Sequence, residues 1–247
     1  MGTDGDETPR RRRGRPSKAS GEVALSRDAL AATALRIAGA EGFGAVTMHR
    51  VAAEHGVSAR ALYNHVRDRQ ELIDLTAALL MEQIPDPVLV PGDWRTSIRQ
   101  TYRHARAAYR RFPRATLISL DEQITTATVP VRRIEITEAM LQLLVDAGLT
   151  PAQAELVRGS FLIDVFGFVL LIDYRYDRAP ASARAAQTHP VPPAWLAAHP
   201  DAAAPIARGL ATAPAPTSDE MFEAMVELRI GAIEHLLAAG QSLVTGE

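Results

Sequence analysis

The side chains with the clearest chemical use lie in segment 59–64, on a short predicted helix. Its outward residues are Ala59, Arg60, Tyr63 and Asn64. An arginine can donate two hydrogen bonds to one guanine, and an asparagine can pair with an adenine in the same groove. A tyrosine hydroxyl suits a phosphate oxygen, and such contacts position a protein on DNA without reading the bases. The segment therefore predicts a helix that enters the major groove of DNA.

A helix-turn-helix at about residues 46–65 would hold these side chains in place. Thr47 is a suitable N-cap for a first short helix, and Ser58 for a second one. Gly56 lies between them and suits a left-handed turn. Two short helices joined by a glycine-containing turn make up this motif.

Longer helices are predicted on both sides of the motif. The first begins after Ser26 and ends at Gly42. The other begins with a capping box between Asp68 and Glu71 and ends before Pro85. Together with the motif they form a predicted DNA-binding domain at residues 22–83.

An arginine-rich arm precedes this domain, with the run Arg-Arg-Arg-Arg-Gly-Arg-Pro at residues 10–16. Its Arg-Gly-Arg-Pro core is typical of an AT-hook, in which arginines such as Arg13 and Arg15 lie along a narrow minor groove. The alternative is a generic basic tail that strengthens binding only through counterion release. The polar composition of residues 1–21 predicts disorder in the absence of DNA.

Charge is distributed unevenly along the chain, although the formal net charge is only −2. Residues 9–70 contain 12 Lys and Arg against 5 Asp and Glu, whereas residues 71–247 contain 15 against 21. A basic front joined to an acidic remainder indicates a nucleic-acid module attached to a domain of another kind.

The rest of the chain, residues 84–247, is predicted to form a larger all-helical domain. Alanine and leucine dominate, and 47% of all residues are hydrophobic. Helices are expected at 94–112, 129–147, 151–176 and 218–238. A long loop is expected at 177–216, which contains half of the sixteen prolines, with one turn near Trp195. The helices at 151–176 and 218–238 are too apolar to remain exposed, and Gly231 would permit close helix approach. We therefore expect these two helices to form a twofold homodimer.

A set of aromatic residues with one acid could bind a small molecule in this domain. The candidate ligand-binding residues are Trp94, Tyr102, Tyr109, Phe161, Asp164 and Phe168. Apolar walls with a few polar groups fit a moderately hydrophobic ligand, aromatic or cationic. Alternatively, the aromatic side chains form the core, and Asp164 is paired with an arginine. A parallel stripe of arginines from Arg95 to Arg110 is either paired with acids or a second nucleic-acid surface.

Signatures of enzymes and metal sites are missing from the sequence. The absence of cysteine excludes disulfides, thiolate metal sites and cysteine nucleophiles. There is no P-loop, His-Glu-x-x-His or Gly-x-Ser-x-Gly motif, and the seven histidines lack metal-ligand spacing. A helical enzyme is therefore disfavoured, and we expect no catalytic residue, metal or cofactor. The charged N-terminus and the short apolar runs predict a cytoplasmic protein without a membrane segment.

The helix-turn-helix region resembles the tetracycline-repressor (TetR) family. The residues that carry the resemblance are Thr47 with Val51-Ala52, Gly56-Val57-Ser58, Leu62-Tyr63-Asn64-His65-Val66 and Arg67-Asp68-Arg69-Gln70-Glu71-Leu72. The resemblance covers about residues 25–82. Beyond them it is one of architecture only, and implies a helical ligand-binding and dimerisation domain.

This resemblance implies DNA contacts at the start of the second helix, on the third helix and on the turn after it. The candidate residues are Thr47, Met48, His49, Ala59, Arg60, Tyr63, Asn64, His65 and Arg69. His65 and Arg69, like Tyr63, suit phosphate contacts. Met48 and His49 depart from the small, hydroxyl or basic residues usual at these positions, so the base preference of relatives does not transfer.

The function implied by the resemblance is sequence-specific regulation of transcription. A repressor of this kind leaves a palindromic double-stranded operator when a small-molecule effector binds. The alternative is an effector-independent DNA-binding activator or architectural protein.

Overall fold

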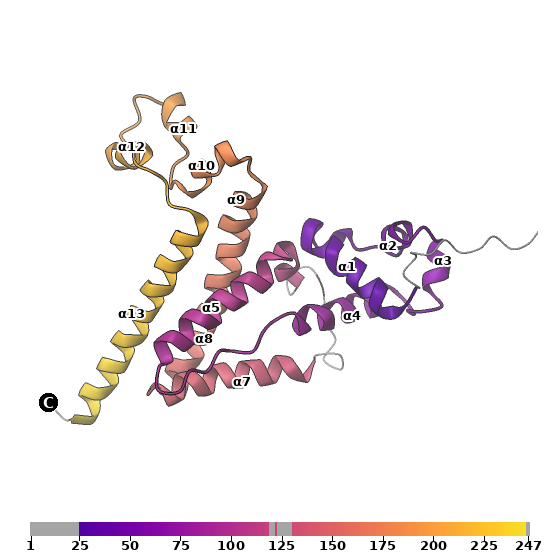
Figure 1. Cartoon of the computed structure of the whole chain (residues 1–247), viewed down its shortest axis with the longest axis horizontal. Coiled ribbons are helices and arrows are strands. Elements are labelled where there is room, and N and C mark those ends of the chain that lie inside the picture. The colour runs from indigo at the N-terminus through magenta and orange to yellow at the C-terminus, as the bar shows by residue number, and fades with distance from the viewer. Residues whose placement is uncertain (1–24, 119–121, 123–129, 246–247) are drawn as a thin grey trace, which may run out of the picture.

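The computed structural model describes residues 25–118, 122 and 130–245, and all regular structure within these ranges is helical. The predicted all-α class is confirmed. Figure 1 shows α1 to α4 at one end of an elongated molecule, with α13 and three short helices at the other end. The basic arm, with Arg13 and Arg15, lies outside the described residues.

The N-terminal domain contains the four predicted helices. They are α1 (Arg27–Glu41), α2 (Met48–Glu54), α3 (Ala59–Leu62) and α4 (Arg69–Glu82), with a 3-10 turn, η1 (Phe43–Ala45), after α1. Side-chain oxygens of the predicted N-caps accept backbone N–H bonds, at 3.1 Å for Ser26 and Thr47 and 2.8 Å for Asp68. Gly56 has φ +64°, as its predicted left-handed turn requires. Ser58 is at the N-cap of α3, but its side chain makes no capping hydrogen bond.

The larger domain is a bundle with a helical appendage. The bundle contains α5 (Trp94–Arg110), α7 (Val131–Asp146), α8 (Pro151–Phe168), the π-helical η4 (Val169–Asp173), α9 (Tyr174–Arg178) and α13 (Ser218–Thr245). A 3-10 segment, η2 (Pro113–Leu117), follows α5. The core of the bundle brings together buried side chains from α5, α7, α8, η4 and α13. The final helix continues past the predicted end at residue 238.

The proline-rich segment 177–216 differs from the predicted long loop. It contains η5 (Ala181–Ala183) and three short helices, α10 (Ala185–Thr188), α11 (Pro193–Ala198) and α12 (Pro205–Thr212). Prolines occupy the first turn of α11 and α12, where their fixed φ suits a helix and no N–H is needed. Alanine-rich sequence then continues each helix. The proline content thus marked helix starts as well as loops.

The two predicted domains share a packed boundary. Ala115 of η2 is fully buried in the core of the N-terminal domain, and Phe112 and Ile118 pack against the same core. Gly39 of α1 allows this approach, because a Cβ at this position would lie 3.0 Å from the Cα of Phe112. The segment after α5 therefore contacts the N-terminal domain directly, although it follows the predicted boundary at residue 83.

Candidate nucleic-acid interface and ligand cavity

The third helix and the turn that follows it present three of the predicted DNA-binding side chains to solvent. Leu62 and Val66 are buried and anchor α3 and the turn after it. Arg60, Tyr63 and Asn64 are exposed, with 55% of Tyr63 accessible. No carboxylate among the described residues is within ion-pair distance of Arg60, so its guanidinium is available to a base or phosphate.

The remaining predicted contacts differ in accessibility. Thr47 and His49 are exposed at the start of α2, whereas Ala59 and His65 are half-buried. Met48 is only 8% exposed and packs in the core of the N-terminal domain. Its place among the candidate contacts is therefore corrected: it is the inward residue of the first turn of α2, which its apolar side chain would have indicated.

Arg69 is also directed into the protein. Its Nε donates to the carbonyl of Val46 at 2.8 Å, and a terminal nitrogen donates to that of Phe43 at 3.0 Å. Glu122 accepts two further hydrogen bonds, at 3.0 and 2.5 Å, and raises the pKa of Arg69. Because these bonds neutralise the guanidinium and hold it against the start of α2, the predicted phosphate contact of Arg69 is replaced by a structural role.

Arg67 is a surface cation that the sequence reasoning missed. Its side chain is 84% exposed on the turn after α3, and its Nε lies 3.2 Å from Glu71. The position of Arg67 next to the turn residues, in the same sequence run, was a signal that could have identified it.

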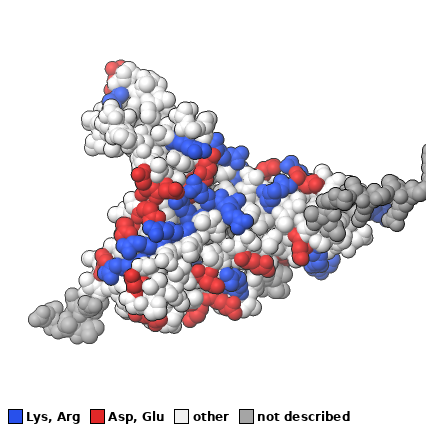
Figure 2. Space-filling model, viewed as in Figure 1, with Lys and Arg blue, Asp and Glu red and all other residues white. Residues whose placement is uncertain are grey.

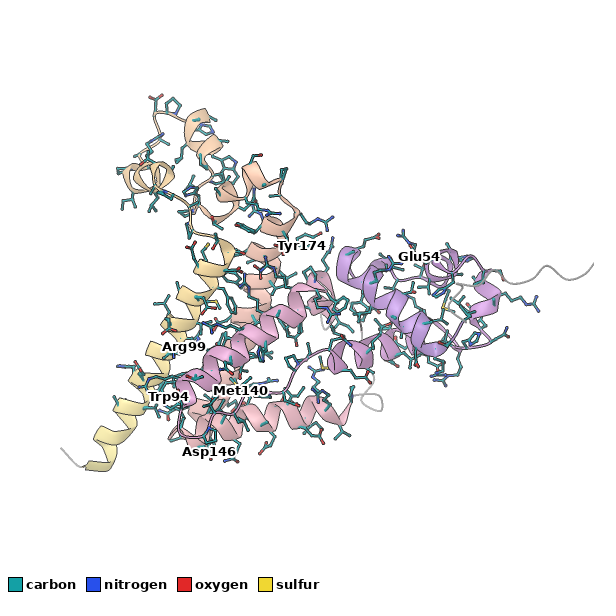
Figure 3. All side chains as sticks on the ribbon, in the orientation of Figure 1. Glu54, Trp94, Arg99, Met140, Asp146 and Tyr174 are labelled. Atoms are coloured by element: carbon teal, nitrogen blue, oxygen red, sulfur yellow. The ribbon has the colours of Figure 1, made fainter. Side chains whose placement is uncertain are left out.

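A cavity lies between α4, α5, η2, α7 and α8, and it encloses about 1190 Å³ of empty space, part of it open to solvent. Its apolar wall includes Leu80 and Met81 of α4, Ala115 of η2 and Met140 of α7. Figure 3 places the labelled Met140 on α7, close to α5. The cavity therefore borders the helix that joins the two domains.

The structure brings only part of the predicted ligand set to this cavity. Tyr109 and Phe161 line it, together with Phe166, whose ring is 4.7 Å from that of Tyr109. Trp94, Tyr102, Asp164 and Phe168 do not line it. Figure 3 shows Trp94 at the end of α5 far from the N-terminal domain, where its ring stacks under Arg95 at 4.6 Å. These four predicted ligand-binding residues therefore lie outside the cavity that Tyr109 and Phe161 line.

Three of them pack instead on the side of the bundle nearer α13. Asp164 accepts hydrogen bonds from Arg229, at 2.8 and 2.9 Å, and from the hydroxyl of Tyr102 at 2.9 Å. The structural alternative for Asp164, pairing with an arginine, is thus confirmed. The pKa of Tyr102 is raised mainly by burial and also by the negative charge of the neighbouring Asp164. Phe168 packs edge-on against Phe222 of α13 at 5.1 Å.

The arginine stripe of α5 pairs with acids, which is the first of the two alternatives predicted from the sequence. Figure 2 shows blue and red side chains in adjoining bands along this face. The pairs are Arg95–Glu234, Arg99–Glu227, Arg103–Glu223, Arg106–Asp173 and Arg110–Asp177, at 2.5 to 2.7 Å. Their charges are satisfied within the protein, which argues against a second nucleic-acid surface on α5.

Two further properties concern other functional classes. No described helix combines the length and hydropathy needed to cross a membrane. Within the described ranges, no cluster of three or more His, Asp or Glu side chains is arranged to hold a metal ion.

Comparison with known proteins gives one match to the N-terminal domain and one to a longer part of the chain. Residues 30–75 match the model for bacterial regulatory proteins of the tetR family. The HTH-type transcriptional repressor DrrR1 of Streptomyces coeruleorubidus is 32% identical over 157 residues, which are 63% of this chain and 55% of DrrR1. The chain thus spans about half the length of this relative.

Solved structures extend the similarity over most of the chain. The Streptomyces coelicolor TetR family protein ActR, in complex with actinorhodin, is 26% identical with a TM-score of 0.64, and covers 87% of this chain and 99% of ActR. ActR with (S)-DNPA gives a TM-score of 0.61 at 26% identity, over 88% and 100% of the two chains. TetR from Acinetobacter baumannii AYE, 17% identical over 86% of this chain and 98% of its own, shares the fold with a TM-score of 0.56. The match to the tetR family of bacterial regulatory proteins thus covers the helix-turn-helix region at residues 30–75, and the solved TetR family structures extend the similarity of fold to most of the chain.

Proposed function

We propose that the chain is a homodimeric transcriptional repressor that binds a palindromic operator and leaves it when a small molecule occupies the cavity. The observation that carries the proposal is a cavity bordered by α4, the helix that follows the exposed recognition helix α3. The relatives DrrR1, a transcriptional repressor, and ActR, solved with small molecules, support it. The proposal includes no catalytic role, and operator binding places the protein in the cytoplasm.

The DNA contacts divide into base reading and phosphate binding. Arg60 and Asn64 are exposed on or just after α3 and carry the side chains that read guanine and adenine. Tyr63 and Arg67 reach phosphates beside the groove, as do Thr47, His49 and His65 at its edges. Arg13 and Arg15 of the arm add affinity along the backbone or minor groove.

The dimer forms through α8 and α13. Large apolar side chains on these helices and η4 are exposed: Leu156, Ile163, Leu171 and Leu228, at 64%, 74%, 66% and 77%. Gly231 of α13 has open space where a Cβ would be. An apolar face of this kind is expected to be covered by a second copy, which would place two recognition helices about one DNA turn, ~34 Å, or more apart.

The switch acts through the packed boundary. A ligand in the cavity touches both α4 and η2, and η2 also packs on α1. A change in the tilt of α4 would alter the separation of the two recognition helices in the dimer. Coupling between ligand and operator is then limited to the difference in ligand affinity between the two arrangements, typically 1–3 kcal/mol. An effector-independent activator or architectural protein would have no use for this cavity.

The test selects operator fragments from random DNA and measures binding by fluorescence anisotropy. We expect Tyr63→Ala to weaken binding to all sequences, and Arg60→Ala to lose about 1–3 kcal/mol of discrimination at one base pair. Arg175→Ala, an exposed arginine on α9, is the matched control. Equal losses on operator and random DNA for Arg60→Ala would refute its base-reading role, and failure to select any sequence would refute the repressor.

A further inference from the structure

Two arginines enter the lining of the otherwise apolar cavity. Arg133 of α7 and Arg158 of α8 stand beside the aromatic rings of Tyr109, Phe161 and Phe166. None of the lining residues that the structure describes is an aspartate or glutamate. Among the described lining residues the charged side chains are therefore both cationic, and the uncharged polar side chains are threonines and Tyr109.

Neither arginine is neutralised by a described carboxylate. Arg158 is half-buried and donates one hydrogen bond to Oγ1 of Thr137 at 3.0 Å. Thr137 in turn donates to the backbone carbonyl of Arg133 at 2.8 Å, which fixes its hydroxyl on α7. The side chain of Arg133 makes no hydrogen bond or ion pair with another described residue and is exposed at the cavity. A guanidinium has five N–H donors, so both residues retain donors for a ligand.

The buried acids Asp164 and Asp173 pair with arginines outside the cavity lining. Asp164, on the same helix as Arg158, is bonded by Arg229 and Tyr102 on the side nearer α13. Asp173 is fully buried against Arg106. Burial raises the pKa of Tyr109 in the cavity wall to about 12, although Arg133 and Arg158 act against that rise. The charges that act on the Tyr109 hydroxyl are therefore both positive.

From this arrangement we infer that the effector is an anion: a planar aromatic molecule whose carboxylate or ionised phenol pairs with Arg158 and Arg133. The inference rests on the proposed function, because it names the ligand class of the same cavity. Aromatic rings of the ligand pack edge-on against Tyr109 and Phe166, and the anionic group accepts hydrogen bonds from the guanidinium groups. A cationic ligand would face two positive charges and no negative charge among the described lining residues.

The test compares three probes that share one ring system and differ only in charge: anthracenecarboxylate, anthracenemethanol and anthracenylmethylammonium. Anthracene fluorescence reports saturable binding to the full chain in the absence of DNA. We expect the carboxylate to bind at least about tenfold more tightly than the alcohol, and the ammonium to bind most weakly.

Single variants assign the preference to the two arginines. Arg158→Gln and Arg133→Gln should each reduce the carboxylate-to-alcohol affinity ratio about three- to tenfold, while the alcohol keeps its affinity within about twofold. Arg175→Gln removes the same charge away from the cavity and should leave the ratio unchanged. Thermal unfolding of each variant checks that the fold is retained, and the two arginines give independent measurements.

The inference is overturned if the carboxylate shows no saturable binding, if the three probes bind equally, or if both variants keep the full preference. Operator binding is measured separately, without any probe. A chain that prefers the anion but selects no operator would refute the repressor and leave the ligand class standing, whereas the reverse result would refute only the ligand class.

Discussion

Replacing Asp173 with asparagine should destabilise the larger domain by about 3 kcal/mol. Asp173 is fully buried and accepts two hydrogen bonds from Arg106, at 2.8 and 2.7 Å, and the side chain of Arg106 is itself only 9% exposed. Removing one partner of a buried ion pair usually costs about 3–5 kcal/mol, because the other charge stays buried without compensation. Asparagine can still accept one hydrogen bond, and Asp219 lies 2.8 Å from Arg106. Both features place the expected loss at the lower end of that range.

Asp177→Asn is the matched control for this variant. Asp177 pairs with Arg110 on the same stripe, but its side chain is 42% exposed, and exposed pairs contribute about 0–1 kcal/mol. Urea unfolding at one protein concentration, followed by circular dichroism, gives both free energies and avoids the concentration dependence of a dimer. Losses of equal size in the two variants would refute the argument that burial sets the strength of these pairs.

Four further outcomes are expected. Hydrogen bonds from the Arg67 backbone and from Arg27 lower the pKa of Glu71 to about 2. The ionised Glu71 should therefore stabilise the fold above the pKa that it has in the unfolded chain, and this effect should fade as pH falls from about 4.5 toward 2. Glu71→Gln should flatten this pH dependence in urea unfolding. Gly39→Ala should destabilise by about 1 kcal/mol net, because overpacking against η2 exceeds the gain in helix propensity, whereas Gly159→Ala, with open space around it, should be neutral or stabilising in thermal unfolding. Leu228→Glu should yield monomers in light scattering at micromolar concentration, and unchanged dimers would exclude α13 from the interface. Deleting residues 1–20 should flatten the slope of log affinity against log salt by about 0.9 per lost phosphate contact, and an unchanged slope would show that the arm does not contact DNA.

The N-terminal domain was predictable because its signals are local. Caps at Ser26, Thr47 and Asp68 and the glycine turn at Gly56 each act within four residues, so the sequence alone contains the reason for each helix boundary. The inward position of Met48 was also a local signal. The DNA contact was assigned to Met48 because of its position in the family motif and not because of the chemistry of its side chain.

Long-range pairing explains most of what the sequence did not reveal. Whether Asp164 faces a ligand or an arginine depends on Arg229, which is 65 residues away in the sequence. The inward direction of Arg69 depends on Glu122, which is 53 residues away. Helical periodicity identifies the face on which a residue lies, but it does not identify the helix that packs against that face.

The position of the cavity follows from the same reasoning. The aromatic residues of α5 point to two sides of that helix: Tyr102 lies against α8 and α13, while Tyr109 borders α4, α7 and α8. Side chains that looked equivalent in the sequence are therefore divided between the core and the cavity. The core side contains the satisfied acids, and the cavity side contains Arg133 and Arg158. Since the cavity side also borders α4 and η2, the free positive charges lie where an anion could act on the position of the DNA-binding domain.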